Sequence, residues 1–235
     1  MPEIQSYMRS LRRSHEARTR ADRPSSFTLR GREWDLLDDV FAPIYSPSTG
    51  VALDFLGWSE PVEVPRSGSF LEVGCGTGVI AVTAALAGCD RVVATDINPQ
   101  AAANARLNAD RHGVAERFRA VQGDLFEAVP AEERFDLVFW SSNYVLAPSG
   151  YRYRSMHERA YVDTGYAAHR RFLDQATGWL TPDGAALLHF SSRGDLAELR
   201  RAAEETGREL RELHRVVVQE GQEEVDHMLL QVLAA

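Results

Sequence analysis

The sequence predicts an α/β protein with a Rossmann-like, doubly wound sheet of seven mostly parallel strands and an antiparallel C-terminal hairpin. Its length of 235 residues suits one such domain with an appendage. From residue 69 onward, short apolar runs alternate with amphipathic segments, as if a strand–helix unit were repeated five times. This alternation is typical of a parallel sheet covered by helices on both faces. Two strand-like runs joined by a polar Glu220-Gly221 turn end the chain and predict the closing hairpin.

The segment before this core differs from it in charge. Residues 1–32 carry eight Arg and three acidic residues, a net charge of +5, whereas the remainder of the chain has a net charge of −13. Apolar residues at helical spacing predict an amphipathic helix over the first 20 residues. An extended hairpin, a Pro-containing loop and a short helix are expected to follow it. We therefore expect residues 1–66 to form a lid or a substrate-side extension of a core domain over residues 67–235.

Each core element is predicted from its length, its apolar pattern and the turn residues beside it. Short apolar runs are typical of buried strands, and the longer amphipathic stretches between them predict helices. Pro99 suits the first turn of one helix, and Thr181-Pro182-Asp183-Gly184 is expected to end another. The expected strands are 69–75, 91–96, 118–124, 135–141 and 185–191, and the expected helices are 78–87, 99–112, 166–180 and 194–206.

Composition and charge exclude several classes of protein. The chain is 44% hydrophobic with a formal net charge of −8, which gives enough apolar material for a core but no generalised basic surface for nucleic acid. No apolar run reaches the roughly 18–20 residues of a membrane helix, and the N-terminus lacks the apolar region of a secretory signal. Two cysteines favour a cytoplasmic protein with reduced thiols and no metal site. All 26 basic residues are Arg, which excludes P-loop and Schiff-base lysine chemistry.

A glycine-rich loop follows the first core strand. The segment Glu72-Val-Gly74-Cys-Gly76-Thr-Gly78 stands at a strand-to-helix turn, where open α/β sheets bind their ligands. A dinucleotide fingerprint would need glycine where Val79 stands. The carboxylate of Glu72 would also repel a phosphate and suit a cation. The loop therefore favours a ligand other than a dinucleotide or a nucleoside triphosphate.

Acidic residues end the next two strands. Asp96 is placed to accept hydrogen bonds from the two hydroxyls of a ribose. Asp124 can accept the exocyclic amine of an adenine, with Leu125 or Phe126 covering the ring. Because the carboxyl ends of parallel strands meet at one edge of a sheet, these residues and the glycine loop predict one pocket. Its expected ligand is a nucleoside that lacks phosphates and carries positive charge.

Three motifs in this order resemble the S-adenosylmethionine (SAM) site of class I methyltransferases. They are LEVGCGTG, VVATDINP and QGDLF, each at the end of its own strand. The resemblance covers about residues 68–235, including the closing hairpin, which would form the family's reversed last strand. It implies SAM as the cofactor, with the glycine loop at its methionine part and the two later acids at ribose and adenine. The implied cofactor-binding residues are Glu72, Gly74, Cys75, Gly76, Gly78, Asp96, Ile97, Asp124 and Leu125.

A finer resemblance concerns the methyl acceptor. The stretch REWDLLDDVFAPIYSPSTG before the core resembles HemK/PrmC-like methyltransferases, whose Asn-Pro-Pro-Tyr motif after the fourth strand binds a planar amide or amine. This chain has the degenerate form Ser141-Ser142-Asn143-Tyr144. By register, Tyr144 matches the aromatic residue and Ser141 the Asn, while Asn143 offers a carbonyl if the loop takes another path. Alternatively, Ser141 and Asn143 only cap the strand end.

The insertion after this motif is dense in aromatic and ionisable residues. Loops of this kind at strand ends often carry substrate contacts. Within it, His157 is a candidate base that takes a proton from the acceptor near neutral pH. The candidate catalytic residues are therefore Ser141, Asn143, Tyr144 and His157.

The resulting hypothesis is an SAM-dependent methyltransferase that modifies a nitrogen or oxygen of a small metabolite or peptide. Methylation of a protein glutamine or of an RNA base is the alternative, with the Arg-rich segment holding the substrate. A non-catalytic module that binds the cofactor is an alternative of another class, and an NAD-dependent oxidoreductase is disfavoured by Val79. The expected partner is a small-molecule or peptide acceptor, with neither a membrane nor a metal.

Overall fold

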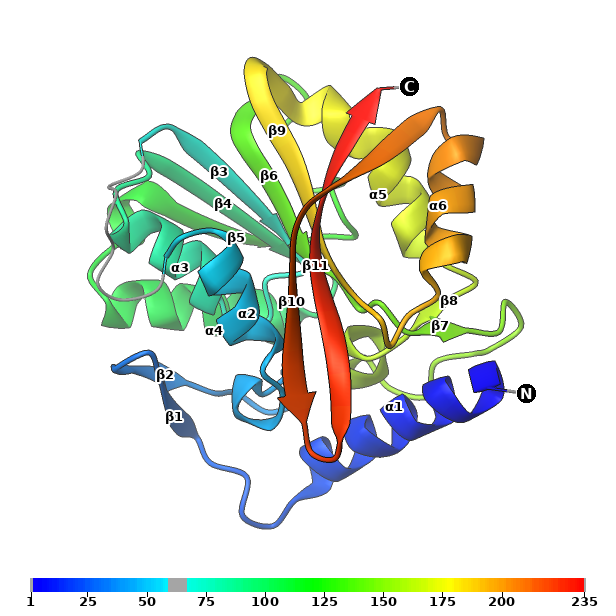
Figure 1. The fold of residues 1–235 in the computed structure, drawn as a ribbon. Helices are drawn as coiled ribbons and strands as arrows, with labels where there is room; N and C mark the ends of the chain where they lie inside the picture. The colour runs from blue at the N-terminus through cyan, green and yellow to red at the C-terminus, as the bar shows by residue number, and fades with distance from the viewer. Residues whose placement is uncertain (1, 59–66, 235) are drawn as a thin grey trace.

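The computed structural model describes residues 2–58 and 67–234, and it confirms the predicted fold class. Seven strands form one sheet in the order β10-β11-β9-β6-β3-β4-β5, with helices on both faces (Figure 1). β11 runs antiparallel to β9 and β10, whereas β3, β4, β5, β6 and β9 are parallel. The seven strands are β3 (Ser69–Val73), β4 (Arg91–Asp96), β5 (Phe118–Gln122), β6 (Phe135–Ser141), β9 (Leu180–Ser191), β10 (Arg208–Glu220) and β11 (Glu223–Ala234).

The helices lie in the connections between these strands and in the N-terminal segment (Figure 1). They are α1 (Pro2–Thr19), α2 (Ser48–Phe55), α3 (Val79–Leu86), α4 (Pro99–Arg111), α5 (Ala167–Gln175) and α6 (Leu196–Glu205). Two small sheets pair β1 (Ser26–Leu29) with β2 (Arg32–Asp35) and β7 (Leu146–Ala147) with β8 (Asp163–Thr164). Short 3-10 turns are η1 (Pro43–Tyr45), η2 (Ala115–Arg117), η3 (His157–Ala160) and η4 (Ala176–Trp179).

Alternate residues of the central strands supply two hydrophobic cores, one on each face of the sheet. Leu187 and Leu229 belong to the core that includes residues of α2, α3 and α4. Leu188 and Leu230, their neighbours in sequence, belong to the core that includes residues of α5 and α6. Strands buried on both faces carry apolar residues at every position, which is why they appear in the sequence as continuous apolar runs.

The N-terminal segment packs directly on the core. α1 shares an apolar cluster with the insertion after β6. The chain around β2 is fixed to α4, because the side-chain oxygens of Asn104 and Asn108 accept hydrogen bonds from the backbone N–H groups of Leu37 and Asp35, at 2.8 and 2.7 Å. The boundary predicted at residue 66 lies outside the described residues.

The expectation of five strand–helix units is wrong at one point. The stretch between β5 and β6, all of which the structure describes, forms turns instead of a helix. It contains Gly123 and Pro130, and both residue types favour turns over helix.

The helix expected over residues 166–180 is shorter than predicted. α5 ends at Gln175, η4 follows, and the supposed turn at residues 181–184 lies inside β9. The pairing with β6 is irregular there, since Leu180 opposes Phe135 but Ala185 opposes Leu137. A bulge of this kind accommodates proline and glycine within a strand.

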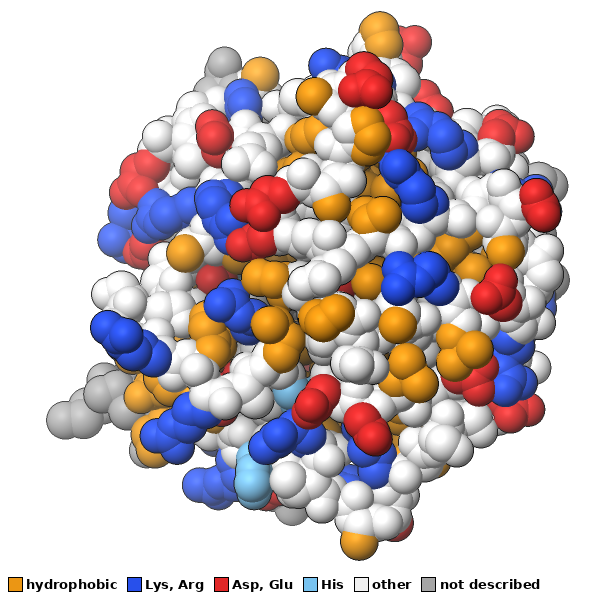
Figure 2. Space-filling model, turned by 180° about the vertical axis from the view of Figure 1, so that it is seen from behind, with side chains coloured by type: hydrophobic (Ala, Val, Ile, Leu, Met, Phe, Trp, Pro, Cys, Tyr) orange, Lys and Arg blue, Asp and Glu red, His pale blue; other side chains and the backbone are white. Residues whose placement is uncertain are grey.

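The surface in Figure 2 carries charges of both signs. The face in Figure 2 mixes basic and acidic side chains instead of gathering one sign of charge. Throughout residues 2–58 and 67–234, no helix is both long and apolar enough to cross a membrane. In the same residues, no three His, Cys, Asp or Glu side chains are grouped so that they could hold a metal ion.

The start of α3 approaches α4 closely at Gly78, which leads to a stability prediction. A Cβ at Gly78 would lie 2.7 Å from the Cα of Ala105, and the residue has a φ of +80°. We expect Gly78→Ala to lower the free energy of unfolding by about 1–2 kcal/mol through the left-handed backbone and by about 1–3 kcal/mol more through overpacking. Gly113→Ala is the matched control, because its φ is +69° but a Cβ there would meet no described atom within 4 Å. Urea unfolding of both variants checks this, and equal losses would contradict the packing argument.

Candidate active site

A cavity of about 260 Å³ opens at the carboxyl ends of the central strands, between the sheet, α1 and the insertion after β6. Almost all of the residues predicted for the site line it together. They are Glu72, Gly74, Cys75, Gly76, Asp96, Ile97, Asp124, Leu125, Ser141, Asn143, Tyr144 and His157. Among the residues predicted for the site, Gly78 is the exception, because it lies in the packing of α3 on α4 and not in the wall of the cavity.

The glycine loop after β3 is bonded to the end of β4. The backbone N–H of Cys75 donates to the carbonyl of Thr95 at 3.0 Å, and that of Gly76 donates to the carboxylate of Asp96 at 2.9 Å. A Cβ at Gly76 would meet no described atom within 4 Å, whereas one at Gly74 would lie 3.1 Å from the indole nitrogen of Trp140. The loop is therefore open toward the cavity at Gly76 and closed against β6 at Gly74.

Asp96 is a half-buried carboxylate with both oxygens in use. One oxygen accepts from Gly76, and the other accepts from the backbone N–H of Asn98 at 2.8 Å. Burial raises the pKa of Asp96 to about 6, although these hydrogen bonds oppose the shift. Each oxygen keeps a second lone pair, so the carboxylate can still accept the hydroxyls of a ribose.

Glu72 is a second carboxylate in the same wall, and it is fully buried. It is 1% exposed, and one of its oxygens accepts from the backbone N–H of Ala81 in α3 at 2.8 Å. Burial, and then the charge of Asp96, raise the pKa of Glu72 well above its usual value. Two carboxylates so placed favour a ligand with positive charge, because such a ligand stabilises their ionised forms. The negative charges of Glu72 and Asp96 thus fit the positively charged sulfonium and ammonium groups of SAM.

The third strand end differs from the first two. Asp124 accepts two hydrogen bonds from Arg171 of α5, at 2.9 and 3.0 Å, so its charge is already balanced. Leu125 lines the cavity and has a φ of +54°. Phe126, the other residue considered for covering an adenine, instead packs on Phe172 and Trp179. Leu125 is therefore the apolar cover that the cavity offers.

The segment after β6 holds the acceptor side of the cavity. The side-chain N–H groups of Asn143 donate to the carbonyls of Arg159 and Val162, at 2.7 and 2.9 Å. Its Oδ1 is buried and has no hydrogen-bond partner among the described residues. The Oγ of Ser141 lies 3.1 Å from Nδ1 of His189. Asn143 thus fixes the insertion and leaves a carbonyl oxygen available, which differs from a simple strand cap.

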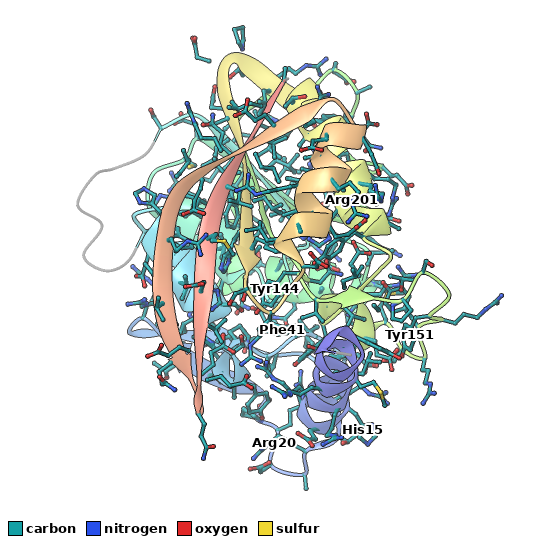
Figure 3. All side chains as sticks on the ribbon, turned by 45° about the vertical axis from the view of Figure 1, so that its right-hand side comes forward. His15, Arg20, Phe41, Tyr144, Tyr151 and Arg201 are labelled. Carbon is teal, nitrogen blue, oxygen red and sulfur yellow. The ribbon has the colours of Figure 1, made fainter. Side chains whose placement is uncertain are left out.

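Tyr144 completes this side of the cavity. Figure 3 shows Tyr144 and Phe41 between the C-terminal hairpin and α1. The backbone carbonyl of Tyr144 accepts from the hydroxyl of Tyr166 at 2.7 Å. Burial, and then the charge of Glu220, raise the pKa of Tyr144 to about 12. Its phenol is therefore neutral and offers an aromatic ring and not a base.

His157 has the surroundings of a structural residue. It is 1% exposed, and its Nδ1 lies 2.8 Å from the Oγ of Ser14 in α1. Burial, and then the charge of Arg23, lower the pKa of His157 to about 4. A conjugate acid this strong makes a weak base at neutral pH. His157 thus connects α1 to η3 at the edge of the cavity.

Sequence reasoning missed lining residues that come from other elements. Arg13 comes from α1, Trp140 from the end of β6, Arg171 from α5 and Arg193 from the turn after β9. Arg193 follows the carboxyl end of β9, and ligands of open α/β sheets bind beyond the carboxyl ends of parallel strands, so the position of Arg193 in the sequence indicates the site as that of Asp96 does. The positive charge of the N-terminal segment was a signal for Arg13, whereas Trp140 and Arg171 have no local signal of a ligand site.

The raised pKa of Asp96 predicts how the affinity for SAM depends on pH. Ribose hydroxyls donate to the ionised carboxylate, so protonation of Asp96 opposes binding, and its pKa of about 6 sets the range. Titration calorimetry should show the Kd for SAM rising about tenfold between pH 7.5 and pH 5, since each unit below the pKa costs up to a factor of about ten. Asp96→Asn should bind more weakly and lose most of this dependence. A constant Kd for the unmodified protein over this range would contradict the role of Asp96.

Known proteins are similar to this chain in both sequence and fold. Residues 70–162 match the family described as methyltransferase domain. The chain is 35% identical over 213 residues to a release factor glutamine methyltransferase of Bordetella pertussis, a match that covers 84% of this chain and 74% of the relative. It is 31% identical over 138 residues to a ribosomal protein uL3 glutamine methyltransferase of Burkholderia pseudomallei, with 53% of this chain and 45% of that relative covered.

Solved methyltransferase structures share the fold. One from Pyrococcus furiosus matches with a TM-score of 0.56 and 18% identity, and the match covers 100% of both chains. Another, solved as a complex with SAH, matches with a TM-score of 0.59 and 14% identity over 88% of this chain and 56% of that chain. These structures show the fold, and the identity to the release factor glutamine methyltransferase shows the family: the chain belongs to the HemK/PrmC type of class I methyltransferases, enzymes whose cofactor is S-adenosylmethionine.

Proposed function

We propose that this enzyme methylates the side-chain carboxamide nitrogen of a glutamine in a protein or peptide. The observation that carries the proposal is the fixed amide of Asn143. Both of its N–H groups are held by backbone carbonyls, so the amide cannot turn over without losing two hydrogen bonds. Its Oδ1, with no partner among the described residues, is left to accept an N–H group in the cavity.

A carboxamide suits this arrangement better than a hydroxyl does. A carboxamide nitrogen has two hydrogens, and two residues that line the cavity, Asn143 and Ser141, carry acceptor oxygens, Oδ1 and Oγ. Neither oxygen is charged, which matches a neutral acceptor. The ring of Tyr144 adds a flat surface beside them, onto which a planar group can stack.

Two segments that cover the cavity support a peptide as the acceptor. Ser10 and Arg13 of α1 and Tyr153 of the insertion line the cavity, and Tyr7 of α1 packs on Tyr151, with the ring centroids 6.0 Å apart. We propose that residues 1–58 form the substrate-side extension in which a peptide is held. The two glutamine methyltransferases described above act, by name, on a release factor and on a ribosomal protein, and acceptors of this kind would place the enzyme in the cytoplasm.

The residues of this chain divide the work of the reaction. Bound SAM supplies an electrophilic methyl group. Glu72 and Asp96 balance its positive charge and hold its ribose, and the backbone at Gly76 leaves room for it. Asn143 and Ser141 orient the acceptor nitrogen, and alignment of this kind, with water excluded, supplies most of the acceleration in methyl transfer.

The direct test uses the two proteins on which the relatives act. Recombinant, unmethylated release factor and uL3 are incubated separately with the enzyme and methyl-tritiated SAM. We expect label in one of the two proteins, and mass spectrometry should place it on a glutamine side chain. Label that enters only RNA or only small metabolites of a cell extract would contradict the proposal and favour one of the other acceptor classes.

Asn143→Ala tests the acceptor side separately. Loss of the hydrogen bond from the acceptor should lower kcat/KM about tenfold to a hundredfold, as expected for about 1–3 kcal/mol. The Kd for SAM should stay unchanged, because Asn143 lies on the acceptor side of the cavity. Ser142→Ala is the matched control, since Ser142 also lines the cavity but donates to the carbonyl of His189. Equal effects of the two substitutions on kcat/KM would remove Asn143 from its proposed role.

A further inference from the structure

A chain of hydrogen bonds leads away from the acceptor side of the cavity through the sheet. Oγ of Ser141 lies 3.1 Å from Nδ1 of His189. Nε2 of His189 lies 2.9 Å from Nδ1 of His227. Nε2 of His227 lies 3.1 Å from Oε1 of Glu220. Four side chains from β6, β9, β11 and β10 are thus connected in one line, which we call the Ser–His–His–Glu chain.

The strand order and register build this line. β6, β9 and β11 are neighbours in the sheet (Figure 1), and Ser141 is the direct partner of His189 in the parallel pairing. In the antiparallel pairing His189 opposes Leu229, so His227 is its diagonal neighbour and lies on the same face. Both imidazoles are completely buried. Water therefore does not compete for these hydrogen bonds.

Glu220 sets the direction of the hydrogen bonds. Its Oε2 accepts from Arg193 at 2.8 Å, so the group is a carboxylate that can only accept. A neutral His227 then donates from Nε2 and accepts at Nδ1, and with it His189 donates from Nε2 and accepts at Nδ1. Ser141 is left to donate to His189. Every donor in the chain has an acceptor, and all of them point from the cavity toward Glu220.

The ionisation states agree with this direction. Burial, and then the neighbouring His227, lower the pKa of His189 to about 3, so this imidazole is neutral and free to accept. Burial favours the neutral form of Glu220, but the hydrogen bond from His227 and the charge of Arg193 outweigh it and hold the pKa of Glu220 below its usual value. The chain is thus neutral at the cavity and negative at its far end.

We propose that the Ser–His–His–Glu chain is a proton relay that removes the proton released when the acceptor nitrogen is methylated. The proposal rests on the proposed function. Methyl transfer forms an N–CH₃ bond, breaks the S–CH₃ bond with its electron pair going to sulfur, and leaves one proton too many on nitrogen. Ser141 takes that proton and passes its own to Nδ1 of His189, whose Nε2 proton moves to Nδ1 of His227. The Nε2 proton of His227 moves to Glu220, which releases it to solvent.

Of the four residues in the Ser–His–His–Glu chain, only Ser141 touches the acceptor, so His189, His227 and Glu220 are positioning and relay residues. The base predicted from the sequence is His157, but its Nδ1 is hydrogen-bonded to Ser14 of α1. Ser141, which stands in the position of the family's Asn, connects the cavity to the carboxylate of Glu220 through the two histidines. The relay therefore supplies proton transfer through a residue that the Asn-Pro-Pro-Tyr form of the motif does not have.

Glu220→Gln is the decisive substitution. A glutamine at this position can still accept from His227 through its oxygen but cannot take up a proton. The substrate is the unmethylated form of whichever protein, release factor or uL3, the enzyme modifies. We expect kcat with this substrate to fall about tenfold to a hundredfold. KM for this substrate and the Kd for SAM should stay within about twofold. Glu223→Gln is the matched control, because Glu223 also pairs with Arg193, at 3.2 Å, but is not part of the chain. Unchanged kcat in Glu220→Gln, or an equal loss in Glu223→Gln, would overturn the relay.

A second measurement does not depend on the acceptor. Nitrogen-15 NMR of the histidine-labelled enzyme, assigned with His189→Gln and His227→Gln, should show both imidazoles with the proton on Nε2. A proton on Nδ1 of either residue would reverse the direction and overturn the relay. If neither release factor nor uL3 is methylated, the proposed function fails, and the NMR result still decides whether the chain has the direction that a relay needs.

Discussion

One hydrogen bond organises the cofactor side of the molecule: the backbone N–H of Gly76 donates to the carboxylate of Asp96 at 2.9 Å. It holds the turn after β3 against the end of β4, so two strands that are separate in sequence form one wall. The same turn leads into α3, whose first residues meet α4 at Gly78. A single carboxylate thus shapes the loop and, in our assignment, receives the ribose.

Charge divides the cavity into two parts. On the cofactor side, Glu72 is a buried and Asp96 a half-buried carboxylate, and the pKa values of both are raised, chiefly by loss of contact with water. A positively charged ligand relieves that cost, so in our assignment these two carboxylates favour a sulfonium compound. On the acceptor side, Ser141 and Asn143 offer neutral oxygens. The negatively charged group connected to these oxygens is the carboxylate of Glu220, which lies at the far end of the Ser–His–His–Glu chain and pairs with Arg193. A cation and a neutral amide are thereby directed to different places.

The sequence predicted the fold class and most of the cofactor side, because these depend on local patterns. Asp96 stands at the end of an apolar run, and the glycines stand where a strand turns into a helix. The acceptor side depends on contacts between distant parts of the chain. The Oδ1 of Asn143 is available only because the carbonyls of Arg159 and Val162 hold the amide nitrogen. His189 gains its partners from β6 and β11, so its pattern in sequence is that of any residue in a buried strand.

The attachment of α1 restricts how an acceptor can be presented. Ser14 joins the helix to His157 on one side, and Arg9 and Arg13 join it to Glu223 and Glu220 of the C-terminal hairpin on the other. With both sides fastened above the cavity, a broad folded surface cannot reach the oxygens of Ser141 and Asn143. Under the proposed function, a glutamine would have to project on a narrow loop or an extended stretch of chain, so the conformation of the acceptor, as much as its sequence, would decide which proteins are methylated.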